Sequence, residues 1–306
     1  MRERINLAIE AVGQVFYGKD QQVRLALACI FSRGHLLIED LPGMGKTTLS
    51  HALARVLGLE YQRLQFTSDM LPADILGVTI FDPQSRTFQF HPGPVFTQVL
   101  LADEVNRTSP KTQSALLEAM EERRITLDAQ TYQLPTPFFV IATQNPVTQY
   151  GTFPLPESQL DRFLMRIELG YPDSKAEREL LTGGDPRARM AQLKAVIEAQ
   201  DLVEISAACA RVKASDSILD YLQRLVGLSR QAPEFSCGIS PRGALALLNA
   251  SRSWAYIHGR DYVVPEDIQM LLGPVIGHRI RAADDVGSYS GTALVQRLLT
   301  QVNVVA

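Results

Sequence analysis

The sequence predicts an α/β fold in which helices cover a parallel, five-stranded sheet, followed by an all-helical domain. Short segments that fit buried strands alternate with amphipathic helical segments, which is typical of a parallel sheet covered on both faces. A glycine-rich turn joins the first predicted strand to a helix, and from about residue 171 the pattern is helical. We therefore expect an α/β domain over residues 1–170 and a helical domain over residues 171–306.

Helical patterns begin the chain and separate the predicted strands. Apolar residues recur at spacings of three and four over residues 5–16, and a second pattern covers residues 23–31. A third helix is predicted over residues 46–57. The clearest is residues 110–122, where Ser109 is the N-cap and proline takes the first helical position, a favoured pairing.

Five short segments between these helices are the predicted strands of the sheet. They are residues 35–39, 61–66, 99–103, 138–143 and 165–169.

A predicted β-hairpin interrupts the alternation. Residues 78–81 (VTIF) and 87–90 (TFQF) fit two short strands, and the polar segment between them contains proline and serine. Because this hairpin lies between two α/β elements, we expect an insert near residues 75–94 that projects from the core.

Composition limits the classes of protein. The 306 residues carry a net charge of −3, which gives no broad basic field for nucleic acid and disfavours such a partner. No apolar run approaches the ~18 residues of a membrane helix, and the first residues lack the apolar core of a signal peptide. Cys29, Cys209 and Cys237 lie far apart and form no CxxC pair. We expect a soluble, cytoplasmic protein without a membrane span.

The turn after the first predicted strand has the residues of a phosphate-binding loop. In Pro42-Gly43-Met44-Gly45-Lys46-Thr47-Thr48, the glycines allow backbone amides to surround phosphate oxygens at a helix N-terminus. Lys46 would reach the β- and γ-phosphates, and the Thr47 hydroxyl would hold Mg²⁺. Asp40 stands where the general pattern has glycine. The alternative interpretation is an ordinary strand-to-helix turn.

Polar side chains follow two further strands. Asp103 and Glu104 end one strand, and Asn145 follows another. Because the carboxyl ends of parallel strands share one edge, these groups would lie near the phosphate turn. There Asp103 could hold Mg²⁺, Glu104 could polarise an attacking water, and Asn145 could orient that water. Alternatively, the acids only start a loop and Asn145 only ends its strand.

Two arginines are candidates for contacts with a phosphoryl group. Arg162 precedes the last predicted strand, where it could stabilise charge on the transferred group or form a surface pair with Asp161. Arg242 lies in the first turn of a helix, where the dipole disfavours a cation. A bound anion or a nearby carboxylate would explain it, and with an anion it would report nucleotide state to the helical domain.

These segments, in this order, resemble AAA+ ATPases and specifically the MoxR family, over nearly the whole chain. Asp40 is similar to what many MoxR members carry at that position. The resemblance is carried by residues 37–47 (LIEDLPGMGKT), 101–107 (LADEVNR), 142–146 (ATQNP), 160–163 (LDRF) and 240–242 (SPR).

The resemblance implies a role for each motif. Lys46 and Thr47 match Walker A, Asp103 and Glu104 match Walker B, and Asn145 matches sensor 1.

In the two remaining motifs, Arg162 matches the arginine finger, which acts on ATP bound by a neighbouring subunit. Arg242 matches sensor 2 in the helical lid. Tyr17 and Gly18 lie where the family's adenine pocket begins. The predicted hairpin looks like the helix-2 insert shared with magnesium chelatases and MCM helicases.

The resemblance further implies ATP and Mg²⁺ as cofactors and ATP hydrolysis as the reaction. MoxR proteins are typically ring hexamers that remodel or mature partner proteins, often partners with von Willebrand factor A domains and metal cofactors. Two alternatives remain at this point: an MCM-like nucleic-acid motor, and a nucleotide-gated scaffold with little turnover. The near-neutral charge counts against the motor.

Overall fold

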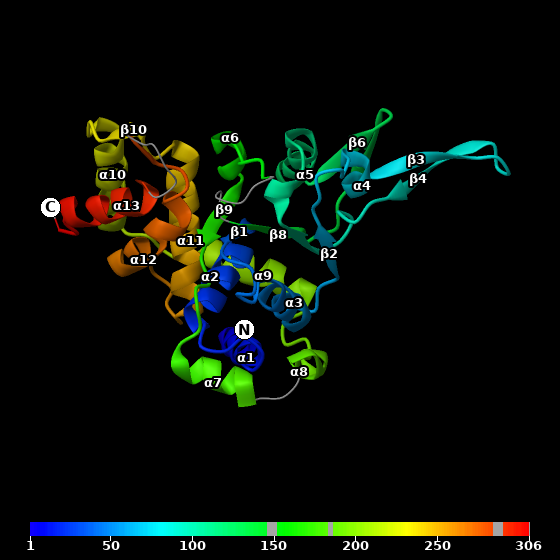
Figure 1. The fold of residues 1–306 in the computed structure, drawn as a ribbon. Helices are drawn as coiled ribbons and strands as arrows, with labels where there is room; N and C mark the ends of the chain where they lie inside the picture. Colours follow the sequence, from blue (N-terminus) through cyan, green and yellow to red (C-terminus); the bar gives the residue numbers. More distant parts are fainter. Residues whose placement is uncertain (146–151, 183–185, 284–289, 306) are drawn as a thin grey trace.

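A parallel five-stranded sheet lies at the centre of the molecule (Figure 1). The fold is that of a computed structural model, which describes residues 1–145, 152–182, 186–283 and 290–305. The strand order is β2-β5-β8-β1-β9, and every neighbouring pair is parallel, which confirms the predicted α/β class. The strands are β1 (His35–Glu39), β2 (Tyr61–Gln65), β5 (Val99–Asp103), β8 (Phe139–Gln144) and β9 (Phe163–Ile167).

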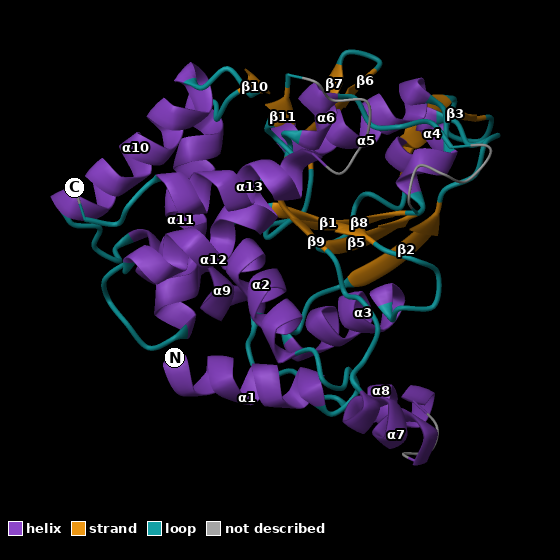
Figure 2. Cartoon of the chain, turned by 60° about the vertical axis from the view of Figure 1, so that its left-hand side comes forward, coloured by secondary structure: helices purple, strands orange, loops and turns teal. Residues whose placement is uncertain are grey.

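Helices cover both faces of the sheet because successive side chains of each buried strand point to opposite sides (Figure 2). Leu36 and Ile38 of β1 belong to one hydrophobic core, with helices α1 to α3, whereas Leu37 belongs to a second core with α4 and α5. These helices are α1 (Arg2–Gly13), α2 (Asp20–Phe31), α3 (Lys46–Val56), α4 (Pro72–Leu76) and α5 (Pro110–Glu122).

The chain after β9 is mainly helical and shares the first of these cores. Buried residues of the later helices, including Trp254, pack in one cluster with those of α1 to α3. The division into two domains at residue 171 stays a prediction.

Within the described residues, no helix has the length and apolar character needed to cross a membrane. The helices are α6 (Glu157–Leu160) before β9, then α7 (Ser174–Thr182), α8 (Pro186–Gln192), α9 (Ala199–Ala210), α10 (Asp216–Gln231), α11 (Pro241–Ile257), α12 (Pro265–Ile276) and α13 (Ser290–Gln301).

Two β-hairpins project from the sheet on the side of α4 and α5 (Figure 1). The predicted one consists of β3 (Gly77–Asp82) and β4 (Thr87–Pro92). The sequence did not predict the second, β6 (Arg124–Leu127) and β7 (Gln130–Gln133). Its turn residues Asp128 and Ala129 both have positive φ, but the turn lacks the glycine that usually marks such a hairpin.

Two details differ from the sequence predictions. The last strand of the sheet begins two residues earlier than predicted and ends at Ile167. The amide of Leu169, predicted as strand, and the amide of Gly170 instead donate to the Asp40 carboxylate, each at 2.7 Å. The helical part also contains a short antiparallel pair, β10 (Phe235–Cys237) and β11 (Arg281–Ala282), too short to give an alternating pattern.

His35, the first residue of β1, is buried, with 6% of its surface exposed, and both ring nitrogens are hydrogen-bonded. Its Nδ1 accepts from the Val140 amide at 3.0 Å, so Nε2 carries the proton and donates to the Met120 carbonyl at 3.1 Å. Burial lowers the pKa of His35 from 6.5 to about 4. His278, also buried, has a pKa well below its usual value for the same reason.

We expect the apparent free energy of unfolding to fall as the solution is acidified. Unfolded histidine binds a proton below 6.5, whereas native His35 does so only near 4, so the unfolded state gains protons in that window. The loss from His35 alone is about 2 kcal/mol between about pH 7 and about pH 5. Urea unfolding at the two pH values measures it. His35→Gln, which can keep both hydrogen bonds, should lose less on acidification, and an unchanged dependence would contradict the assignment.

Candidate nucleotide-binding site

The turn between β1 and α3 forms an open cradle at the carboxyl edge of the sheet. Gly43 and Gly45 have φ values of 86° and 89°, which side chains rarely adopt. Gly45 is also the N-cap of α3, and a Cβ there would lie 2.9 Å from the Phe16 ring. The two glycines thus allow the backbone amides to face a space at a helix N-terminus, the arrangement that binds anions.

A cavity of about 430 Å³ opens at this turn and brings the predicted residues together. Met44 does not line this cavity and packs against the first hydrophobic core, the one that contains residues of α1 to α3. Pro146, the last residue of the 142–146 segment, lies outside the described residues. The cavity is lined by Pro42, Gly43, Gly45, Lys46, Thr47, Thr48, Arg63, Gln65, Asp103, Glu104 and Asn145.

Lys46 is a largely buried cation held at the strand ends. Its Nζ donates to the Asp40 carbonyl at 2.6 Å and to Asn145 Oδ1 at 3.1 Å. Burial lowers the pKa of Lys46, while the carboxylates of Asp103, Asp40 and Glu104 oppose that shift. The ammonium group therefore lies between the phosphate turn and the ends of two neighbouring strands.

The Glu104 carboxylate is held by three side chains. Asn145 Nδ2 donates to Oε1 at 2.8 Å, Gln65 Nε2 donates to Oε2 at 2.7 Å, and Arg107 lies 3.2 Å from Oε2. Glu104 has a positive φ of 57°, an uncommon conformation for a residue with a side chain. Its amide donates to Thr143 Oγ1 at 2.8 Å, which stabilises the turn.

Asp103 is buried at the end of β5 and accepts two strong hydrogen bonds. Thr143 Oγ1 donates to its Oδ1 at 2.6 Å, and the Arg63 guanidinium donates to its Oδ2 at 2.6 Å. The Asp103 carboxylate and the Thr47 hydroxyl line the same cavity and are the hard oxygen donors that Mg²⁺ prefers beside substrate phosphates. The residues present therefore fit a magnesium ion.

Sequence reasoning missed Arg63, Gln65, Arg107 and Thr143. Arg63 and Gln65 are two residues apart on β2, so their side chains lie on the same face of the sheet, and β2 pairs with β5 beside them. Their polar character in a strand of the sheet was the available signal, but only the strand order shows that β5 is the neighbour.

Tyr17 and Gly18 lie beside the phosphate turn but do not line its cavity. The Tyr17 ring faces the Arg189 guanidinium, 5.1 Å from ring centre to carbon. A Cβ on Gly18 would lie 2.7 Å from the Cβ of Ala176 in α7, and Phe16 touches the turn at Gly45. This loop thus connects the phosphate turn to the start of the helical part, and its predicted role at the adenine stays a prediction.

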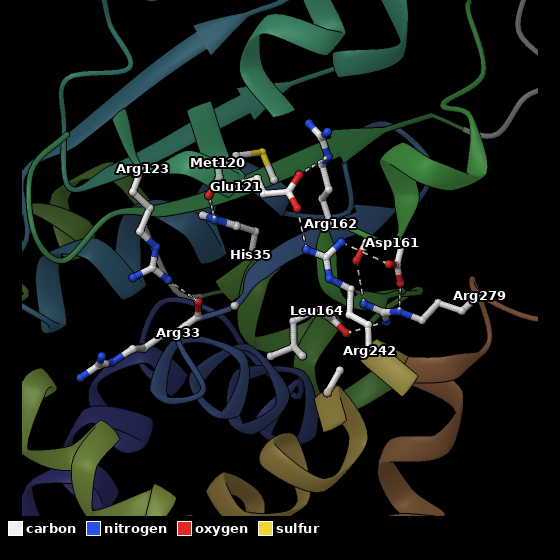
Figure 3. Close-up of a pocket in the computed structure, with 12 residues that line it drawn as sticks. Arg33, His35, Met120, Glu121, Arg123, Asp161, Arg162, Leu164, Arg242 and Arg279 are labelled. Atoms are coloured by element: carbon white, nitrogen blue, oxygen red, sulfur yellow. Dashed lines mark hydrogen bonds and ion pairs between the residues drawn. The ribbon is translucent and has the colours of Figure 1, made fainter. Parts of the chain in front are cut away.

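Arg162 and Arg242 lie close to each other in a different cavity (Figure 3), at the opposite edge of the sheet. Arg162 precedes β9, whose first residue pairs with His35 at the start of β1, whereas the phosphate turn follows the end of β1. Five strand residues separate the two edges by roughly 15 Å. The structure therefore brings the two arginines to each other and not to the phosphate cavity. In particular, it does not place Arg242 to report its own subunit's nucleotide.

Comparisons with known proteins agree with the fold and the site. Residues 35–165 match the ATPase family associated with various cellular activities (AAA), and residues 228–298 match the AAA lid domain. A crystal structure of a protein from Cytophaga hutchinsonii superposes with a TM-score of 0.87 at 36% identity, covering 99% of this chain and 95% of that one. A glycine-rich turn beside a strand that ends in two acids, followed by an AAA lid, defines this chain as an AAA ATPase.

Relatives that match most of the chain give the family. The chain is 43% identical to the Bacillus subtilis protein YeaC over 97% of its length and 93% of the relative. It is 39% identical to Chaperone MoxR1 of Mycobacterium tuberculosis over 89% of its length and 74% of that protein. Protein MoxR of Methylorubrum extorquens is 34% identical, with coverage of 88% and 85%. The protein belongs to the MoxR family, which confirms the predicted resemblance.

Proposed function

We propose that the protein hydrolyses ATP to ADP and phosphate and uses this reaction to remodel or mature partner proteins. The proposal rests on one observation: the predicted lysine, threonine, acids and asparagine all line the same cavity at the phosphate turn. These residues are Lys46, Thr47, Asp103, Glu104 and Asn145. Chaperone-like action is supported by the name of one relative, Chaperone MoxR1.

Nucleotide binding would use the turn and its lysine. The backbone amides of residues 43–48 would surround the phosphates, and Lys46 would exchange its contacts with Asp40 and Asn145 for phosphate oxygens. Thr47 and Asp103 would hold Mg²⁺, which neutralises charge on the phosphates when bound. Tyr17 and Gly18 would border the adenine.

Hydrolysis would depend on Glu104 and Asn145. Glu104 can polarise a water for attack on the γ-phosphate, and Asn145, 2.8 Å from that carboxylate, can orient it. Because both side chains come from adjacent strand ends, their separation is fixed by the β5–β8 pairing.

Arg162 and Arg242 would act on a neighbouring subunit. Neither lines the phosphate cavity of its own chain, and both lie at the far edge of the sheet. In a head-to-tail ring, that edge would face the next subunit's nucleotide, where guanidinium groups stabilise charge on the transferred phosphoryl group. We therefore propose a ring, with six subunits as the expected number.

Client proteins stay unnamed, and partners with von Willebrand factor A domains are the expected class. Cytoplasmic location likewise stays a prediction. Proteins retained by a Glu104→Gln variant in the presence of ATP would identify clients.

Steady-state turnover separates the proposal from a nucleotide-gated scaffold, and ATPase stimulated by DNA would favour the MCM-like motor instead.

Lys46→Ala should lose ATP affinity by about ten- to a hundredfold, because it removes a charged hydrogen-bond donor to phosphate. Titration with a fluorescent ATP analogue measures the change. Lys111→Ala removes an exposed lysine of α5 and is the matched control. Equal affinity in the two variants would contradict nucleotide binding at this turn.

A further inference from the structure

Arg162 and Arg242 share one carboxylate. Arg162 Nε lies 3.0 Å from Glu121 Oε2, and Arg242 Nη2 donates to Glu121 Oε1 at 2.6 Å. Figure 3 shows Glu121, at the end of α5, between the two guanidinium groups. The arginines come from separate elements, the segment before β9 and the first turn of α11, so Glu121 is the group that bridges them.

The second acid of this cluster is already engaged by a different arginine. Asp161 Oδ1 accepts from Arg279 Nε at 2.7 Å, and the Arg279 side chain is only 5% exposed. Arg242 reaches Asp161 Oδ2 at the longer distance of 3.5 Å. Glu121 is therefore the principal counter-charge of Arg162 and Arg242.

The cavity around this cluster has an excess of positive charge. Among the described residues that line it, five are arginines and two are acids, and its volume is about 210 Å³. The arginines are Arg33, Arg123, Arg162, Arg242 and Arg279.

The pairs with Glu121 can be broken at modest cost. Arg162, Arg242 and Glu121 have side-chain exposures of 28%, 56% and 35%, so water screens both ion pairs. Phosphate presents oxygens that guanidinium groups bind in the same paired geometry as a carboxylate. The hydrogen bond from Arg242 lowers the pKa of Glu121, so the carboxylate is ionised at neutral pH and must be displaced as a charge.

We propose that Glu121 is a positioning residue that occupies Arg162 and Arg242 in the separate subunit and releases them to the γ-phosphate held by a neighbouring subunit. Glu121 thereby opposes association until ATP is present on the neighbour. The inference rests on the proposed function, since it requires the two arginines to act across a subunit interface. A purely structural role, in which Glu121 only fastens α11 to α5, makes the opposite prediction for association.

Glu121→Gln tests the proposal because it removes the charge but keeps a hydrogen-bond acceptor. Association is measured by sedimentation against protein concentration, with Mg²⁺ and a non-hydrolysable ATP analogue. We expect half-maximal association at about three- to tenfold lower protein concentration, since two screened ion pairs no longer have to break. An unchanged or higher midpoint would overturn the proposal.

Glu122→Gln is the matched control. Glu122 is the next residue of α5 and pairs at 3.1 Å with exposed Arg124, so this variant makes the same charge change outside the cluster. Its midpoint should equal that of the parent. Thermal unfolding identifies a destabilised variant. If Glu121→Gln does not fold, Glu121→Ala carries the same expectation and the same contrary outcome.

Arg162→Ala separates failure of this inference from failure of the proposed function. If Arg162→Ala leaves both association and ATP hydrolysis unchanged, the action across subunits is wrong. If Arg162→Ala weakens either property while Glu121→Gln behaves like Glu122→Gln, only the role of Glu121 is wrong.

Discussion

Glu104→Gln should bind ATP as the parent protein does and hydrolyse it about a hundredfold to ten-thousandfold more slowly, the range for loss of a general base. The substitution keeps the shape of the side chain. In the parent protein Asn145 Nδ2 donates to the Glu104 carboxylate at 2.8 Å, and the amide oxygen of the glutamine can still accept this hydrogen bond. What it removes is the negative charge that polarises water. The measurements are ATP affinity and phosphate release per subunit.

Glu118→Gln is the control for this experiment. Glu118 is an exposed residue of α5 that does not line the phosphate cavity, and its variant has the same change of net charge. It should hydrolyse ATP at the parental rate. A Glu104→Gln protein with parental turnover would show that the carboxylate has another role, and the proposed reaction would then lack its base.

The residues that meet in the cavity at the turn after β1 were predictable because most of them lie in one short stretch of sequence. Gly43, Gly45 and Lys46 follow one another in a turn whose strand and helix are both evident from the sequence. Asp103 and Asn145 could be assigned to the same site because all parallel strands of a sheet end at one edge. That shared edge follows from the fold class and does not require knowing which strands are neighbours.

The contacts that hold those residues were not predictable in the same way. Gln65 and Glu104 are far apart along the chain and meet only because β2 borders β5, a strand order that no local pattern encodes. Asp40 shows the same limit. Its departure from the phosphate-loop pattern was visible, but its contacts with the amides of Leu169 and Gly170 depend on where β9 ends.

The arginine cluster shows a further limit. A basic residue in the first turn of α11 indicated either a bound anion or a nearby carboxylate, and the structure contains the carboxylate, Glu121. Since Glu121 lies at the end of a helix in the α/β part, its contact with Arg242 arises only from the packing of the later helices against the sheet.

Arg162→Ala should bind ATP normally and lose about a thousandfold or more of its hydrolysis rate, the magnitude found for arginines that stabilise phosphoryl transfer. The geometry gives the reason for the first half of this expectation. Arg162 lies at the edge of the sheet opposite the phosphate turn, so its removal leaves the cavity of its own subunit intact.

Mixing two inactive variants tests whether Arg162 acts between subunits. Lys46→Ala lacks a working nucleotide site but keeps Arg162, whereas Arg162→Ala keeps the site and lacks the arginine. In a mixed ring, a Lys46→Ala subunit can supply its arginine to the intact site of an Arg162→Ala neighbour. Hydrolysis should therefore reappear on mixing, with a maximum at intermediate ratios. An Arg162 that acted within its own chain would leave every mixture inactive, because neither subunit then contains both groups.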